Sequence, residues 1–491
     1  MKISDLLKYE SVIYIDPRLD TEKELKIATD PKECDEDSLL FFSKKVGRDT
    51  YNLPTFKDHG PYAIVCEWDT EELVCETPLV RVNNVRWALA SSYSEMYEID
   101  YQRMKLVGIT GTNGKTSTAT MLYSILRDTG KNIGLIGTGI IKINDNVVSD
   151  DYHSMTTPDP SELYKILGKM KEFGCEYVVM EVSSHAISLS KVAPIKFECG
   201  IFTNLSPEHM DFHKDMEEYY RTKLSLFKQC KNGIFNMDDI YSRRAYDSVS
   251  CAKHSVGVIN KAEAYATEIM QNGLNGSSFY YREKSLIFKQ NLQLPGAYNI
   301  YNALMALKCA ITLGIKPCLA KKALSELSGI EGRMEIIEND ITVIIDYAHT
   351  PFALENLLKT LNSCKNIRQK LIVVFGCGGN RDKSKRPIMG EISSRCADTV
   401  IITEDNNRGE KFEDIATDII SGMKDDTHFT KIADRRAAIT YAILGAKRGD
   451  IIAVVGKGHE KYKIDSEGYH RFDEREIISA ALEKRRDRDE S

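Results

Sequence analysis

Several features that mark specialised classes of protein are missing from this sequence. Its twelve cysteines form no CxxC pair and no Cys/His cluster with zinc-ligand spacing, so we expect neither a disulfide framework nor a structural zinc site. No apolar run approaches the ~20 residues that span a bilayer, and residues 1–20 are charged throughout, without the apolar stretch of a signal peptide. The sequence therefore predicts a cytoplasmic protein without stable membrane insertion.

An excess of positive charge is missing as well. The formal net charge is −6, and Lys and Arg form no dominating basic run or tail, which disfavours a non-specific nucleic-acid binder. With 42% hydrophobic and 28% charged residues, the composition is that of a globular protein. We expect the functionally important basic residues to lie only where anionic ligands bind. We also expect a monomer.

The length exceeds what one hydrophobic core usually serves. At ~150 residues per domain, 491 residues suggest about three domains, which we place at 1–103, 104–332 and 333–491. Short apolar runs at 38–42 and 62–68, separated by charged and turn-like stretches, predict a small N-terminal α/β domain. We expect the charged tail, 482–491, to be a frayed, solvated end.

Apolar strands alternate with helical segments in the rest of the chain. Residues 105–110 predict a buried strand, a glycine turn follows, and 117–130 predict an amphipathic helix; apolar runs at 177–182 and 198–205 continue the alternation. This pattern predicts a central P-loop domain with a doubly wound parallel sheet. After the GRME segment about four apolar strands end in Gly, Asp or His, which predicts a C-terminal Rossmann-like α/β domain with ligand-facing loops.

The glycine turn at 108–116, GITGTNGKT, predicts a phosphate site. It departs from strict P-loop spacing, because Ile109 stands where the first glycine belongs. Glycines still let backbone amides converge on phosphate oxygens, the helix N-terminus adds positive potential, Lys115 neutralises phosphate and Thr116 can ligate magnesium. A turn that merely joins strand to helix is the alternative, which Lys115 and Thr116 at the required places disfavour.

The segments after this turn resemble the Mur ligase family in content and order. They are TTPDP (156–160), EVSSHAI (181–187), NLSPEHMDFH (204–213), YYRTKLSLF (219–227), PGAYNIYNALMAL (295–307), GRME (332–335), DYAHTP (346–351), GCGGNRDKSKRP (376–387), EDNNR (404–408) and GKGHE (456–460). The resemblance runs from about Met104 to His459 and implies an ATP-dependent ligase that forms an amide through an acyl phosphate. It is greatest to the branch that adds a diamino acid to UDP-N-acetylmuramoyl-L-alanyl-D-glutamate in peptidoglycan synthesis.

The resemblance implies a catalytic group of Lys115, Glu181, His209 and Lys223. Glu181 follows an apolar strand and would hold magnesium with Thr116, while His209 would ligate a second magnesium. Lys223 matches the lysine that this family carbamylates, which turns a cation into an anion that helps hold the second metal. Spacing alone leaves the alternatives open. Glu181 could be a surface residue, His209 a structural residue and Lys223 an ordinary helix residue.

The resemblance also assigns the binding residues. ATP would be bound by Gly111, Thr112, Asn113, Gly114, Lys115, Thr116, Ser117, Asn299, Asn302, Arg333, Asp346, Tyr347 and His349. Asn299 and Asn302 are three apart on one predicted helix face, although an N-cap role for Asn299 is open. The UDP-muramyl dipeptide would contact Thr156, Thr157, Ser184, His185 and Lys191, the last replacing the Arg of many relatives. The added amino acid would contact Arg381, Asn406, Arg408, Gly456 and Glu460.

Arg408 bears on which amino acid is added. The branch that adds diaminopimelate usually has DNPR, whose Arg pairs with the distal carboxylate that lysine lacks. Here the Arg is kept and Asn407 replaces the Pro, which frees the backbone. We favour meso-diaminopimelate, with L-lysine or another amino acid as the alternative, and a surface role for Arg408 beside Glu404, Asp405 and Glu410 also stays open.

Three other functions share parts of this pattern. A folylpolyglutamate-type ligase has the same glycine turn and the same kind of metal site. It does not need TTPDP, DNNR and GKGHE in this arrangement. A non-catalytic nucleotide-binding relative would not need Lys115, Glu181, His209 and Lys223 together. A specialised ligase for an unusual muramyl peptide remains the third alternative.

Overall fold

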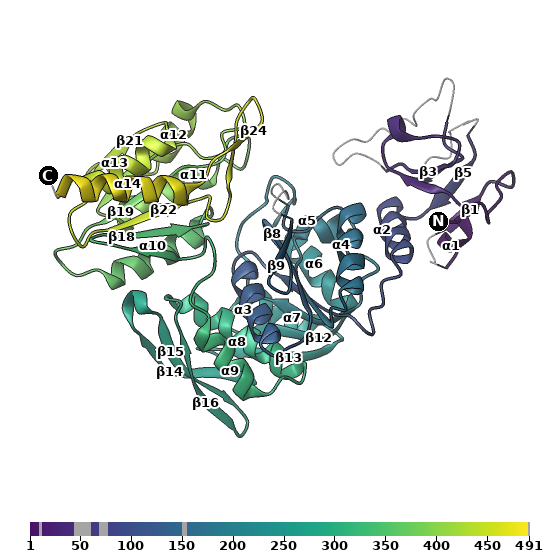
Figure 1. Cartoon of the computed structure of the whole chain (residues 1–491), viewed down its shortest axis with the longest axis horizontal. Helices are drawn as coiled ribbons and strands as arrows, with labels where there is room; N and C mark the ends of the chain where they lie inside the picture. The colour runs from purple at the N-terminus through teal and green to yellow at the C-terminus, as the bar shows by residue number, and fades with distance from the viewer. Residues whose placement is uncertain (9–11, 44–59, 68–76, 150–154, 490–491) are drawn as a thin grey trace.

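Three sheets with their helices follow one another along the chain in the computed structural model (Figure 1). The structure describes residues 1–8, 12–43, 60–67, 77–149 and 155–489. In Figure 1 the N-terminal part, in purple, and the C-terminal part, in yellow and green, lie at opposite ends, with the teal central part between them. The α/β class and the order of three α/β units predicted from the sequence are confirmed.

The N-terminal sheet has the strand order β1 (Val12–Ile15), β5 (Leu79–Val82), β4 (Ala63–Glu67), β3 (Ser38–Phe41), β2 (Lys26–Ala28). Only the β1–β5 pair is antiparallel. β3 and β4 are the two predicted apolar runs, although Trp68 lies outside the described residues. Helix α1 is Ile3–Leu6 and η1 is Pro31–Glu33. Helix α2 (Val85–Met96) packs against two cores. Val85 belongs to the N-terminal core and Ala90 to the central core.

The central sheet has eleven strands in the order β16 (Leu286–Leu292), β15 (Ser277–Glu283), β14 (Ala264–Gln271), β13 (Ala252–Gly257), β12 (Cys230–Asn236), β11 (Phe197–Phe202), β6 (Lys105–Thr110), β10 (Tyr177–Glu181), β7 (Ile133–Gly137), β8 (Ile140–Ile143), β9 (Asn146–Ser149). From β7 to β14 neighbouring strands are parallel, and both ends of the sheet continue as antiparallel strands. The parallel part has β6, the strand before the glycine turn, near its middle.

Two apolar cores cover the two faces of the central sheet, as a doubly wound domain requires. Helices α3 (Lys115–Arg127), α8 (Ala297–Thr312) and α9 (Pro317–Glu326) contribute to one core. Helices α4 (Pro160–Glu172), α5 (Ser184–Ser188), α6 (Met216–Ser225) with η2 (Leu226–Gln229), and α7 (Ile240–Ser248) contribute to the other. The turn η3 (Gly273–Asn275), between β14 and β15, reaches helix α10 (Pro351–Cys364) of the C-terminal part, where Leu274 packs against the core.

The C-terminal sheet has six strands in the order β17 (Glu335–Glu338), β18 (Thr342–Asp346), β22 (Ile451–Val455), β19 (Leu371–Phe375), β20 (Thr399–Ile402), β21 (Phe429–Lys431), parallel except for β17. Helices α10 (Pro351–Cys364), α11 (Lys385–Cys396), α12 (Phe412–Ile420), α13 (Arg435–Gly445) and α14 (Glu474–Asp489) surround it, and β23 (Tyr462–Ile464) pairs with β24 (Tyr469–Arg471). The four predicted strands are β18, β19, β20 and β22.

Two expectations about this part were wrong. The sheet has two further edge strands, β17 and β21, whose residues are half-buried or exposed, so that neither forms an apolar run. The charged tail is not frayed as far as Asp489, because α14 continues through it with Leu482 and Arg485 turned inward. The Arg485 guanidinium bonds Asp340 and the carbonyls of Ile443 and Ala446, which holds the helix against the domain.

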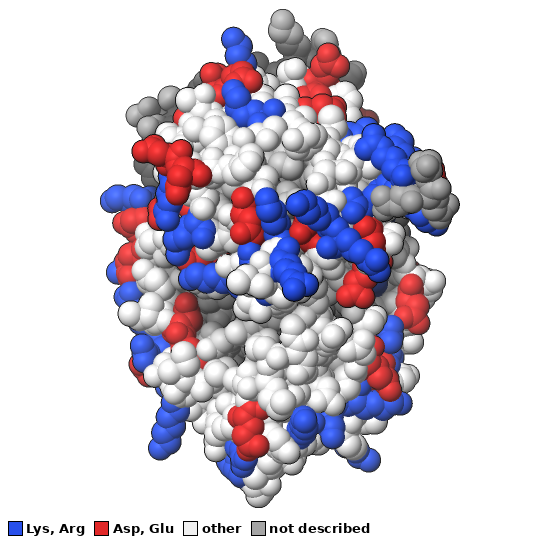
Figure 2. Space-filling view, turned by 90° about the vertical axis from the view of Figure 1, so that its left-hand side faces the viewer, with Lys and Arg blue, Asp and Glu red and all other residues white. Residues whose placement is uncertain are grey.

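The segments expected to carry function follow the carboxyl ends of parallel strands. β6, β10 and β18 end at Thr110, Glu181 and Asp346, the last being the first residue of DYAHTP, and β20 and β22 end just before the EDNNR and GKGHE segments. Ligands usually bind at such strand ends. None of the helices in the described part of the chain is long and apolar enough to cross a membrane. On the face that Figure 2 shows, Lys and Arg are interspersed with Asp and Glu, without a continuous surface of one sign.

Candidate active site

Two glycines in left-handed or extended positive-φ conformations shape the turn between β6 and α3. Gly111 and Gly114 have φ of 144° and 84°, and Gly114 caps α3 in the left-handed conformation. A Cβ on Gly111 would lie 1.9 Å from Oγ1 of Thr203, so no larger residue fits there. The amides of Thr112 and Asn113 bond the carbonyl and side chain of Asn204. Residues directly after β11 therefore hold the turn in place at the N-terminus of α3.

Lys115, the expected phosphate lysine, folds back over its own turn. Its ammonium donates to the carbonyls of Gly111 and Thr112 at 3.0 and 2.8 Å. Burial lowers the pKa of Lys115, against the attraction of Glu208 and Glu181. Two neutral carbonyls compensate a buried cation poorly, so a phosphate placed in the turn would find an available positive partner.

Glu181 and Thr116 lie together, as a magnesium site requires. The Glu181 side chain is 1% exposed, and its carboxylate accepts from the Thr116 hydroxyl at 3.0 Å and from the amide of Thr138 at 3.0 Å. Oxygen donors of this kind are those that Mg²⁺ prefers, with phosphate and water completing its octahedron. No cluster of three or more His, Cys, Asp or Glu with metal-binding geometry occurs among the described residues.

His209 and Lys223 both lie near the ring of Tyr219. Lys223, on α6, is 1% exposed, donates to the carbonyl of Gly111 at 2.9 Å and lies 4.7 Å from the ring centroid of Tyr219. The ring of His209 is perpendicular to that of His185, with centroids 4.9 Å apart. Burial lowers the pKa of His209 to about 4, with Glu208 opposing, so its imidazole is neutral at pH 7 and free to act as a ligand.

Lys223 is a buried cation without an acidic partner among the described residues. Burial lowers its pKa well below the usual value, and the positive charge of Lys115 lowers it further. As an ammonium Lys223 would repel a divalent cation. As a carbamate the same side chain would carry a negative charge and two oxygens.

The expected dipeptide-binding residues gather beside Glu181. Thr157 donates to the backbone carbonyl of Glu181 at 3.0 Å, and Thr156 accepts from the Thr138 hydroxyl at 3.0 Å. The Ser184 hydroxyl is buried without a hydrogen-bond partner in the described structure. Lys191 pairs with Asp159 at 2.7 Å, so a substrate anion would have to compete with Asp159 for it.

Asn299 and Asn302 share one face of α8, as their spacing predicts. Asn302 accepts from the Thr118 hydroxyl of α3 at 3.3 Å and donates to Asn299 at 3.1 Å. The N-cap alternative for Asn299 was wrong, because Gly296 caps the helix and Asn299 bonds the carbonyl of Pro295. Both asparagines are buried behind the glycine turn, and a Cβ on Gly114 would lie 2.5 Å from the Asn302 Oδ1.

Residues of the C-terminal part complete the phosphate region. The Arg333 guanidinium donates to the Thr116 hydroxyl at 3.0 Å and lies 4.4 Å from the ring centroid of Tyr347. His349 Nε2 lies 3.2 Å from an oxygen of Glu208. Asp346 accepts the amides of Met334 and Ala348 at 2.7 and 2.8 Å, which fixes the loop after β18. Arg333, Tyr347 and His349 thus face the central domain.

The expected amino-acid residues form a second group on the C-terminal sheet. Asn406 donates to the Glu460 carboxylate at 3.0 Å, and Arg408 donates to the Asn406 backbone carbonyl at 3.2 Å. A Cβ on Gly378 would approach both Arg408 and the exposed Arg381, and one on Gly456, whose φ is 117°, would lie 2.6 Å from Asp405. The Tyr347 hydroxyl donates to Glu460 at 3.3 Å, so Tyr347 links this group to Arg333.

The surface alternative for Arg408 is disfavoured by its neighbours. Glu410 pairs with Arg386 and Lys383, and Glu404 pairs with Lys463. Asp405 lies 3.8 Å from Lys457. None of these acids forms an ion pair with Arg408 within the described residues, so its guanidinium is available to an anionic ligand.

Sequence reasoning did not single out Glu208, Thr138 or Lys457. Glu208 precedes His209 and faces Lys115 and His349, Thr138 bonds Glu181, and Lys457 is buried under Asn406 and Glu460. Glu208 and Lys457 lie inside segments that resemble the family, whereas Thr138 lies outside them. Polar residues directly after an apolar strand, as in Gly137–Thr138, are the signal that could have identified Thr138.

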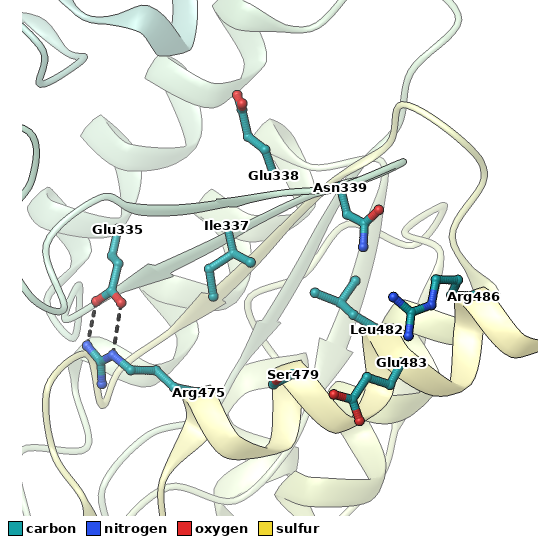
Figure 3. Close-up of a pocket in the computed structure, with 9 residues that line it drawn as sticks. All are labelled: Glu335, Ile337, Glu338, Asn339, Arg475, Ser479, Leu482, Glu483 and Arg486. Carbon is teal, nitrogen blue, oxygen red and sulfur yellow. Dashed lines mark hydrogen bonds and ion pairs between the residues drawn. The ribbon is translucent and has the colours of Figure 1, made fainter.

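A hollow of about 410 Å³ lies elsewhere, between β17 and α14 (Figure 3). At one end Arg475 makes two hydrogen bonds to Glu335, which also accepts the amide of Gly332. The charged groups drawn in Figure 3 come from β17 and α14, and the Arg475–Glu335 pair links these two elements.

Comparisons with known proteins cover nearly the whole chain. The family description "Mur ligase middle domain" matches residues 109–310, and "Mur ligase, glutamate ligase domain" matches residues 332–458. A UDP-N-acetylmuramoyl-L-alanyl-D-glutamate–2,6-diaminopimelate ligase of Clostridium acetobutylicum is 39% identical over 460 residues, 93% of this chain and 94% of the relative. The ligase of the same name from Clostridium tetani is 36% identical over 99% of this chain and 100% of the relative.

A solved structure of a UDP-N-acetylmuramoyl-L-alanyl-D-glutamate–2,6-diaminopimelate ligase is also similar. Its TM-score is 0.67 at 25% sequence identity, with 99% of both chains covered. Because the alignments with this structure and with the Clostridium tetani ligase include the N-terminal part, the similarity extends beyond the segment from Met104 to His459 found from motifs.

Proposed function

Because the chain belongs to the Mur ligase family, we propose that it joins meso-diaminopimelate to UDP-N-acetylmuramoyl-L-alanyl-D-glutamate at the expense of ATP. The single observation that carries this proposal is a chain of contacts between two groups of residues. The group around Thr116 and Glu181 is linked through Arg333 and Tyr347 to the group around Asn406 and Glu460. The relatives named after this reaction support the substrates.

Arg408 supports diaminopimelate as the added amino acid. Its guanidinium is held beside Asn406 and is not paired with the acids around it within the described residues. Diaminopimelate carries a distal carboxylate that Arg408 can bind with two parallel hydrogen bonds, whereas L-lysine has none. L-lysine would leave Arg408 without an anion, which costs binding energy when a charged donor is removed from water.

The proposed chemistry divides between the two groups. The γ-carboxylate of the dipeptide's glutamate attacks the γ-phosphorus of ATP, which forms an acyl phosphate and releases ADP. Lys115, Arg333 and the amides of the glycine turn bind and orient the phosphates. The amine of diaminopimelate then attacks the acyl carbon, loses a proton and displaces phosphate. Contacts between the central and C-terminal domains exclude water, which would otherwise hydrolyse the acyl phosphate.

Magnesium fits the donors on both sides of Lys115. Thr116 and Glu181 would hold one ion on the phosphates, and His209 and a carbamylated Lys223 would hold a second; bound there, the ions would neutralise charge on phosphate and carboxylate. Carbamylation joins CO₂ to the neutral Nζ of Lys223 and releases one proton. The burial of Lys223 and the absence of an acidic partner for it in the described structure support this modification.

The remaining roles belong to the same proposal. Thr156, Thr157, Ser184 and Lys191 bind the muramyl dipeptide, and Asn299 and Asn302 support the nucleotide from α8. The N-terminal domain, 1–103, receives the UDP end, while 104–332 binds ATP and 333–491 binds the amino acid. Magnesium, ATP and the two substrates are the partners that the site requires.

ADP release with magnesium, ATP and UDP-N-acetylmuramoyl-L-alanyl-D-glutamate tests the proposal directly. We expect release that depends on meso-diaminopimelate, with L-lysine supporting it at least about tenfold less well, the range that a missing charged hydrogen bond produces. A preference for L-lysine would keep the ligase reaction and contradict the role of Arg408. No release with either, but release with a folate substrate and glutamate, would contradict the proposal as a whole.

A further inference from the structure

Lys457, in the GKGHE segment, is one of the most completely buried charged side chains of the protein. Only 1% of it is exposed. Its ammonium donates to the Asn406 Oδ1 at 2.9 Å and to the Glu460 Oε2 at 3.4 Å, and Asp405 Oδ1 lies 3.8 Å away. A buried ammonium is expensive unless its surroundings use it, and here it contacts two residues of the proposed amino-acid site.

These contacts determine which way the Asn406 amide points. Its oxygen accepts from Lys457 and also from the amide of Ile464 at 2.9 Å, while its nitrogen donates to Glu460 Oε2 at 3.0 Å. The reverse orientation would place the amide N–H groups against two donors and leave Glu460 without one. The second hydrogen of the Asn406 amide has no partner in the described structure and is available to a ligand.

Glu460 is fixed by the same cation. Its Oε2 accepts hydrogen bonds from Lys457 and Asn406, and its Oε1 accepts one from the hydroxyl of Tyr347 at 3.3 Å. A carboxylate oxygen has more than one acceptor position, so Glu460 can still bind an ammonium group. Asn406 and Glu460 therefore present a donor and an acceptor side by side.

We propose that Lys457 is a positioning residue that holds Asn406 and Glu460 as an adjacent donor and acceptor for the carboxylate and ammonium of the incoming amino acid. This inference rests on the proposed function. Lys457 itself is covered by these side chains and by Tyr462, whose ring centroid is 5.7 Å from its ammonium, so it acts through them. Without its charge, Asn406 can rotate, and Asp405 and Glu460 become two close carboxylates without a compensating cation.

Lys457→Met, which keeps the length of the side chain and removes its charge, is the test. We expect the KM for diaminopimelate to rise about tenfold or more, as for a lost hydrogen bond to a charged group, while kcat and the KM for ATP stay within about twofold. Lys463→Met, on the following strand β23, is the matched control, because its ammonium pairs with Glu404; the KM for diaminopimelate should not change in this variant. An unchanged KM in Lys457→Met, or an equal loss in every parameter, would overturn the inference.

Asn406→Asp keeps the test decisive if Lys457→Met does not fold. An aspartate still accepts from Lys457 and Ile464, but it loses the hydrogen bond to Glu460 and has no N–H for the substrate carboxylate; circular dichroism of this variant checks that it is folded. We expect a KM for diaminopimelate raised about tenfold or more, and an unchanged KM would contradict the orientation argued here. Wild-type protein without diaminopimelate-dependent ADP release would instead contradict the proposed function, independently of both variants.

Discussion

The electrostatics of the proposed site depend on single residues. Lys223 shows that the residue type alone does not tell the charge of a side chain. Its ammonium is buried against a carbonyl and a tyrosine ring, near Lys115. An unmodified lysine there opposes metal binding, whereas a carbamate favours it. The same side chain therefore supports opposite expectations, depending on one covalent modification.

Lys223→Ala tests the modification. We expect kcat to fall by a factor of about 100 or more, because an anion that holds charge at the reacting centre is lost and such groups contribute about 2.7–4 kcal/mol. Assays with added acetate or another short carboxylate should restore part of the rate, since the anion can occupy the space left by the side chain. Full activity without added acid would remove Lys223 from the mechanism, and Lys228→Ala, on an exposed position of η2, serves as control.

Predictions from sequence succeeded where local pattern and chemistry coincide. Apolar runs identified β6, β10, β18 and β22 because buried parallel strands need continuous apolar residues. β17 and β21 were missed because edge strands have no such run. The sequence places Thr116 directly after the glycine turn and Glu181 at the end of an apolar strand, and the structure has a hydrogen bond between them because neighbouring parallel strands end together. The Tyr347–Glu460 bond and the burial of Lys457 depend on tertiary packing, which no local pattern contains.

At the scale of elements, a buried ion network joins α8 to the antiparallel end of the central sheet. Lys308 of α8 is 3% exposed and pairs with Glu263 at 2.9 Å and with Glu283 of β15 at 2.6 Å. His254 of β13 approaches Glu263 at 3.1 Å. Since α8 also carries Asn299 and Asn302, this network holds the helix behind the glycine turn.

Lys308→Met should destabilise the protein by about 3–5 kcal/mol, because two carboxylates lose their buried cation. Urea unfolding at pH 7 measures this. Burial raises the pKa of Glu263, but hydrogen bonds from Lys308 and His254 outweigh burial and lower it overall. The stability from Glu263 is therefore present above the pKa of the unfolded state, about 4.3, and is lost as the pH falls below it.

The difference between wild type and Lys308→Met should accordingly shrink as the pH falls from 7 to below about 4. Lys322→Met, on the exposed side of α9, is the control and should leave stability nearly unchanged. Equal unfolding free energies of wild type and Lys308→Met at pH 7 would contradict a stabilising network.

At the scale of the whole molecule, the site exists only where the central and C-terminal domains meet. Arg333 reaches Thr116, His349 reaches Glu208, and a Cβ on Gly139 would lie 2.6 Å from the ring of His459. Gly332 has φ of 65° and is packed against Gly458 and His459, where a Cβ would lie 2.2 Å from the backbone. Glu335, which pairs with Arg475 in Figure 3, also accepts the amide of Gly332.

Glu208→Gln tests whether these contacts control the joining of the two domains. A hydrogen bond between an imidazole and a carboxylate is worth about 1.5–3 kcal/mol when one partner is charged, so its weakening should shift the equilibrium towards separated domains by roughly a factor of 10–100. Small-angle X-ray scattering without ligands should then show a larger radius of gyration than wild type, and ATP with magnesium should reduce it. Glu198→Gln, whose carboxylate pairs with Lys231 inside the central domain, should leave the radius unchanged; the same radius in Glu208→Gln as in wild type would show that Arg333 and Gly332 hold the domains together without Glu208.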